Sequence, residues 1–126
     1  MTNSFCQTFH CGVCDGASNC GLRDNNVKYE FSKSREALET AELTMPEENK
    51  KVVCSNFVAR ALCLMLNNKG TVLEKDIMCN FIWQGRIVGE NSLPVLINEI
   101  RKILKVTRSK FMIVTIRGVG YMCVEG

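Results

Sequence analysis

Residues 92–121 have the sequence SLPVLINEIRKILKVTRSKFMIVTIRGVGY, and this stretch decides the fold. At about 100° per residue, a helix over residues 93–105 gathers its large apolar side chains on one narrow stripe. The apolar run 111–116, the turn 117–120 and the segment 121–124 then predict a β-hairpin. The stripe consists of Leu93, Ile97, Ile100 and Leu104, with Leu96 and Ile103 beside it.

The start and the outer face of this helix can also be predicted. Ser92 is expected to cap it, because a serine hydroxyl can accept a hydrogen bond from the first turn. Pro94 is tolerated there, because its missing N–H would have no partner. The face opposite the stripe carries Val95, Asn98, Lys102 and Lys105, with Glu99 and Arg101 at its edges.

Two more helices are predicted before it. The first begins after Ser55, a suitable N-cap, and ends in the glycine-containing segment 67–70. A short extended link, 71–73, leads to a second helix over residues 74–83, and residues 85–91 form a loop with two glycines. The inward residues are expected to be Phe57, Ala61, Leu62, Met65 and Leu66 in the first helix, and Ile77, Met78, Phe81 and Ile82 in the second.

The region before the helices has weaker patterns. Residues 27–31 suit a short strand, and residues 34–43 suit either a second strand or one helical turn. Residues 45–50 are expected to be a surface connection, and Val52 and Val53 to close a small N-terminal sheet. We therefore predict a cysteine-rich N-terminal segment, 1–26, followed by one α+β domain, 27–126.

Composition narrows the class of protein. With 126 residues and 46% hydrophobic residues, the chain can form a core without disulfides. Its apolar runs are far shorter than the roughly 20 residues of a membrane span, and residues 1–20 lack the features of a signal peptide. We expect a cytoplasmic chain, or the cytoplasmic part of a longer protein.

The charge is unevenly distributed. The formal net charge is +3, but residues 86–117 contain seven Lys or Arg residues against Glu90 and Glu99. Residues 30–50 are instead dominated by six glutamates. A basic C-terminal segment of this kind is typical of a surface that binds nucleic acid, although an ordinary solvated surface shows the same bias.

Two motifs resemble a known family. Asn91-Ser92-Leu93 with Ile97, Ile100-Arg101-Lys102 and Leu104, followed by Thr115-Ile116-Arg117-Gly118-Val119-Gly120-Tyr121, resembles the OmpR/PhoB-type effector domain. The resemblance covers residues 52–124 and is greatest to the ToxR-like branch, whose members are often anchored in the bacterial inner membrane. It implies a winged helix–turn–helix with a small N-terminal antiparallel sheet, three helices and a C-terminal hairpin wing.

The resemblance also implies a function, which is to bind double-stranded promoter DNA and usually to activate transcription. The loop from Gln84 to Asn91 would contact RNA polymerase, and the domain would bind as a homodimer or in tandem. In the major groove, Asn98 would contact adenine, Arg101 guanine or a phosphate, and Val95 a thymine methyl. Further contacts are expected from Ser92, Lys102, Lys105 and Thr115 to phosphates, and from Arg117 to the minor groove.

Glu99 departs from the family pattern, in which many relatives have a basic residue. A carboxylate near phosphates is unfavourable unless it accepts a hydrogen bond from cytosine or pairs with a lysine. The operator sequence is therefore not inferred from the relatives. Glu99 also supports an alternative function, in which the domain binds RNA polymerase or another regulator instead of DNA.

The cysteines fall into two groups. Cys54, Cys63, Cys79 and Cys123 lie within apolar patterns and are expected to be small buried side chains. The second group is Cys6, His10, Cys11, Cys14 and Cys20, which could bind zinc or an iron–sulfur cluster, form a redox pair, or remain reduced thiols without such a role. We predict no cofactor, and keep a metal- or redox-gated regulator as a further alternative.

An enzyme is not expected. His10 is the only histidine of the chain, and no serine or carboxylate constellation accompanies it. No glycine-rich loop for a phosphate group is present either.

Overall fold

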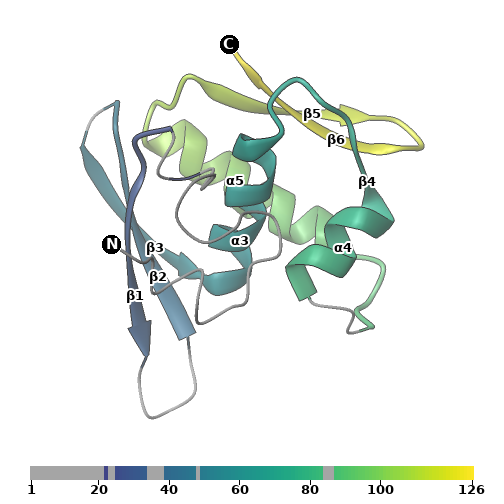
Figure 1. Cartoon of the computed structure of the whole chain (residues 1–126), viewed down its shortest axis with the longest axis horizontal. Helices are drawn as coiled ribbons and strands as arrows, with labels where there is room; N and C mark the ends of the chain where they lie inside the picture. The colour runs from purple at the N-terminus through teal and green to yellow at the C-terminus, as the bar shows by residue number, and fades with distance from the viewer. Residues whose placement is uncertain (1–21, 23–24, 34–38, 48, 84–86) are drawn as a thin grey trace.

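The computed structural model describes residues 22, 25–33, 39–47, 49–83 and 87–126. In this part of the chain, three helices pack against two three-stranded antiparallel sheets, one at the side and one along an edge of the helices (Figure 1). The fold is therefore the α+β winged helix that the sequence predicts.

The first sheet consists of β1 (Lys28–Lys33), β2 (Glu39–Met45) and β3 (Lys50–Ser55), in that order. The ambiguous segment 34–43 is a strand from Glu39 onward, while residues 34–38 lie outside the described residues. The prediction of a surface connection over residues 45–50 was wrong at both ends. Met45 is fully buried and pairs with Lys50 in the ladder, because it projects to the same core face as Leu43 two residues earlier.

The helix α3 (Asn56–Asn67) is the centre of the core. It packs against both other helices and against strands of both sheets. Its N-terminus is capped as predicted, since the Val58 N–H donates to the Ser55 hydroxyl at 3.3 Å. At its other end Gly70 has a φ of +79°, a backbone conformation that glycine adopts without steric cost.

The second sheet holds the hairpin against the helices. Its strands are β4 (Leu73–Glu74), β5 (Phe111–Ile116) and β6 (Gly120–Glu125), and β6 lies between the other two. Because β4 directly precedes α4 (Lys75–Trp83), its pairing with β6 joins the hairpin to the start of that helix. The hairpin also packs, through β5, against the last helix of the chain, which directly precedes it in sequence.

The helix α5 (Ser92–Val106) follows and buries the predicted stripe. Leu93, Leu96, Ile97, Ile100 and Leu104 are all buried, and Ile103 is half-buried. Ser92 is not the cap, however. The first helical bond runs from the Val95 N–H to the Asn91 carbonyl, so the helix begins one residue earlier than predicted and no side chain caps it.

Two predictions of burial on α4 were wrong. Ile77 is 53% exposed, because it lies about 100° around the helix from the buried stripe of Met78 and Ile82. Cys79 lies on the other side of that stripe and is only half-buried. Cys54, Cys63 and Cys123 are buried, as predicted.

Candidate nucleic-acid interface

The outer face of α5 is a row of exposed side chains on a rigid support. Val95 is 55% exposed, and Asn98, Lys102 and Lys105 are exposed as well. At 1.5 Å per residue the helix is about 22 Å long, and its opposite face is anchored in the core. The four residues that the sequence assigned to this face are therefore brought together on it.

The two flanks of this face differ. Arg101 lies on the flank that meets the hairpin, about 80° around the helix from Leu93, whereas Glu99 and Ser92 lie on the opposite flank. The Arg101 guanidinium donates from Nε and Nη2 to the Ile113 carbonyl, at 3.3 and 3.0 Å, and from Nη2 to the Thr115 hydroxyl at 2.8 Å. The α5 helix and the β5 strand are thus joined by one side chain.

Glu99 faces the N-terminal sheet. It lines an open cavity of about 500 Å³, together with Ser55 at the end of β3 and the aromatic pair Phe57 and Trp83, whose ring centroids are 5.9 Å apart. Burial, and then the negative charge of Glu99, raise the pKa of the Cys54 thiol to about 12. The carboxylate is therefore at the edge of the outer face, away from the hairpin.

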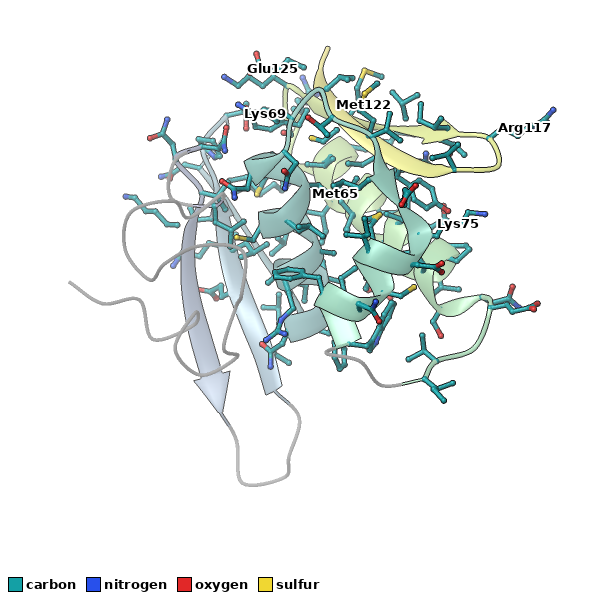
Figure 2. The ribbon with its side chains drawn as sticks, turned by 45° about the vertical axis from the view of Figure 1, so that its right-hand side comes forward. Met65, Lys69, Lys75, Arg117, Met122 and Glu125 are labelled. Carbon is teal, nitrogen blue, oxygen red and sulfur yellow. The ribbon has the colours of Figure 1, made fainter. Side chains whose placement is uncertain are left out.

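The hairpin turn presents Arg117. The turn is closed by the Val119 N–H, which donates to the Ile116 carbonyl at 3.0 Å, and Gly118 has a φ of +77°. Figure 2 shows the Arg117 side chain pointing outward from this turn, away from the body of the domain. The β5–β6 hairpin thus carries an outward-pointing guanidinium at its tip.

Gly120 has a different structural role from Gly118. Of these two glycines, only Gly118 has a positive φ. A Cβ on Gly120 would collide with the carbonyl group of Leu73, because β4 approaches β6 closely at this position. The glycine is needed for this approach and not for the turn.

Among the described residues, no carboxylate forms an ion pair with Lys102, Lys105 or Arg117. The ion pairs among the described residues are Lys51–Glu42 and Lys69–Glu125, and neither involves α5 or the hairpin turn. Lys102, Lys105 and Arg117 therefore project charge into solvent. Such charges attract a polyanion, and the attraction decreases as salt increases.

The partners of Arg101 could not be predicted from the sequence. Arg101 and Thr115 were each expected to contact DNA, although their side chains bind each other across 14 residues of sequence. Such a contact leaves no periodic signal, and two of the three hydrogen bonds of Arg101 are made to a backbone carbonyl. The metal candidates Cys6, His10, Cys11, Cys14 and Cys20 lie outside the described residues, and no metal-binding group of three His, Cys, Asp or Glu residues occurs within them.

Comparison with protein families gives the identity of the domain. The family described as "Transcriptional regulatory protein, C terminal" matches residues 49–123, more than half of the chain. The chain belongs to this family. This family, the OmpR/PhoB-type DNA-binding domain, consists of transcriptional regulators, and the match begins at the turn before β3 and ends within β6.

A solved structure supports the same OmpR/PhoB-type assignment. The C-terminal domain of the nisin resistance regulator NsrR, described as a lantibiotic response regulator, is 26% identical with a TM-score of 0.52. The match covers 73% of this chain and 88% of that one. No curated protein gives a significant match. Among the described residues, every helix is too short or too polar to span a bilayer.

Proposed function

We propose that this domain binds promoter DNA in a sequence-specific manner, with α5 in the major groove and the β5–β6 hairpin in the minor groove. One observation carries the proposal. The exposed face of α5, which has amide and cationic side chains, is joined at its Arg101 edge to β5, the strand that leads into the turn with Arg117. A helix of about 10–12 Å diameter fits the roughly 12 Å wide major groove.

We assign the base contacts to the centre of the outer face. Asn98 can make a bidentate contact to adenine, and Val95 can pack on a thymine methyl. Lys102 and Lys105 would bind phosphates, which fix the register of the helix on the duplex. Ser92 and Glu99, on the flank toward the first sheet, would contact a phosphate and a cytosine amino group.

Arg117 would enter the minor groove. A narrow minor groove concentrates negative potential and therefore favours an inserted guanidinium. The Gly118 conformation lets the turn approach the sugar–phosphate backbone, because no Cβ projects from it. Thr115, which lies on β5 two residues before Arg117, would be near the phosphates of this sugar–phosphate backbone.

The test begins with selection of bound duplexes from a random-sequence DNA library. Lys102→Ala and Arg117→Ala should each weaken binding to the selected duplex by roughly 5- to 100-fold, with unchanged circular dichroism. Lys102→Ala should also reduce the slope of log K against log salt by about one. The control is Lys51→Ala, an exposed lysine on the first sheet that should bind like wild type.

Full affinity in both variants would overturn the assignment of the two grooves. Selection of no preferred duplex, with no salt-dependent binding by the wild type, would favour the alternative of a protein-interaction module. The spacing of half-sites in the selected duplexes would report whether two copies bind in tandem.

We further propose that the domain activates transcription through the loop between α4 and α5. Ile87, in the described part of that loop, has a fully exposed side chain, and Ile77 of α4 is half-exposed. Exposed apolar side chains of this kind suit a contact with another protein, here RNA polymerase. Ile87→Ser should reduce transcription from the selected promoter in vitro and leave DNA affinity unchanged, whereas equal transcription would exclude the loop from this role.

A further inference from the structure

Arg101 uses most of its hydrogen-bonding capacity within the domain. A guanidinium has five N–H donors. Nε and one donor of Nη2 are directed to the Ile113 carbonyl, and the other donor of Nη2 binds the Thr115 hydroxyl. The edge formed by Nε and Nη2, which could otherwise make a two-point contact to guanine, is therefore occupied by β5.

This contact joins the two elements that would touch DNA. Arg101 belongs to α5, and its partners lie on β5, the strand that leads into the turn with Arg117. Thr115 is only two residues from Arg117, so the bond fixes the strand close to the tip of the hairpin. In Figure 1 the hairpin runs beside α5, and Figure 2 shows Arg117 at its tip, with the side chain pointing outward.

We propose that Arg101 is a positioning residue, which fixes Arg117 at the distance from α5 that allows both grooves to be occupied at once. The proposal rests on the DNA-binding function proposed above, and it replaces the direct contact to guanine or phosphate that the family resemblance implies for Arg101. On its β6 side the turn is held by β4 and by the Lys75 N–H, which donates to the Val119 carbonyl at 3.2 Å. On its β5 side the Arg101 link joins the strand to α5. Loss of this link would leave the β5 side more mobile, and the entropic cost of ordering it on DNA would weaken the contact made by Arg117.

The shape of the side chain separates this role from a phosphate contact. A lysine has the same charge, and it can replace arginine as a single-point phosphate contact. It cannot reproduce a planar fork that binds the Ile113 carbonyl and the Thr115 hydroxyl together. Arg101→Lys therefore keeps the charge and removes the geometry.

A double-mutant cycle with Arg117 tests the proposal on the duplex selected above. We expect Arg101→Lys and Arg117→Ala each to weaken affinity about 10-fold. The double variant should also be about 10-fold weaker, because Arg101 acts through Arg117. Lys102→Ala is the control, since its effect should multiply with that of Arg117→Ala to about 100-fold. Independent effects of Arg101→Lys and Arg117→Ala, or full affinity in Arg101→Lys, would overturn the proposal.

Thr115→Val provides a second variant that leaves Arg101 in place. It removes the 2.8 Å bond and should weaken affinity in the same direction, again only when Arg117 is present. Backbone ¹⁵N relaxation of residues 117–119 in the DNA-free chain gives an independent measurement. Arg101→Lys and Thr115→Val should each increase motion in this turn relative to wild type and to Lys102→Ala.

The relaxation measurement also separates the two proposals. If the wild type binds no duplex, the proposed function fails, while a rise in motion still supports Arg101 as the residue that orders the hairpin. Unchanged motion in both variants would reject the role of Arg101, even where DNA binding is confirmed.

Discussion

The carbonyl group of Leu73 occupies the space into which a side chain at position 120 would project, so β4 and β6 can pair only because residue 120 is glycine. This contact holds the turn end of the hairpin against the start of α4, where the Lys75 N–H also donates to the Val119 carbonyl at 3.2 Å. Gly118, only two residues away, differs from Gly120 in both respects: it has open space around it and a positive φ.

The two glycines should therefore respond differently to substitution. Gly120→Ala should lower the free energy of unfolding by about 3 kcal/mol, because backbone atoms must move to admit the methyl group. Gly118→Ala should cost about 1 kcal/mol, which is the strain of a left-handed residue without a clash. Urea denaturation measures the loss of unfolding free energy in each variant. Equal losses in the two variants would contradict the prediction.

The N-termini of α3 and α5 form a second matched pair. Ser55→Ala should lower the free energy of unfolding by about 1 kcal/mol, because it removes the acceptor for the Val58 N–H. Asn91→Ala should cost much less, because the Asn91 side chain makes no bond to the first turn of α5. Thermal unfolding of the two variants would disprove this account if Asn91→Ala proved the more damaging.

Glu99 should determine the sequence preference of the domain. Glu99→Gln removes a negative charge from the edge of the DNA-facing surface, so affinity for unrelated duplexes should rise by a few-fold. A preference for cytosine at one position of the selected site should decrease at the same time. Selection repeated with the variant checks both effects, and an identical preferred site would show that Glu99 does not contact a base.

The buried thiols make the stability of the domain sensitive to alkaline pH. Burial raises the pKa of Cys54 from 9.0 to about 12, and burial also raises that of Cys123 to about 11. Since folding favours the protonated thiols, their contribution is complete below pH 9 and is lost as the pH rises through these values. At pH 8 these two thiols should react more slowly with Ellman's reagent than the half-buried Cys79.

The matched variant for the thiols is Cys123→Ala. Its free energy of unfolding should fall less steeply than that of wild type between pH 9 and 11, by up to about 1.4 kcal/mol per pH unit. Parallel pH curves for the two proteins would contradict this expectation.

The sequence predicted those parts of the fold that depend on periodic burial. The stripe from Leu93 to Leu104 has a helical period, and the hairpin is marked by an apolar strand and two glycines, so both were predicted with nearly correct bounds. Features set by single backbone bonds or by contacts between elements were not predictable. The start of α5 is set by a backbone bond to Asn91, and the exposure of Ile77 depends on which neighbours cover α4.

The candidate site shows the same difference. The exposure of Asn98, Lys102 and Lys105 follows directly from their position opposite the stripe, and the structure places them there. The orientation of Arg101 toward β5 and of Glu99 toward the first sheet depends on where those elements pack. A single sequence contains no signal for that arrangement. The contacts of all these residues with DNA remain predictions.

Within the described residues, the side chains on the outer face of α5 make no bonds that hold the domain together. Val95, Asn98 and Lys102 can therefore be exchanged without disturbing the core, which is built by the other side of the same helix. A library varied at these three positions should contain mostly folded proteins. The domain is thus suited to acquire new operators, in natural descent or by design, through changes that leave its stability almost untouched.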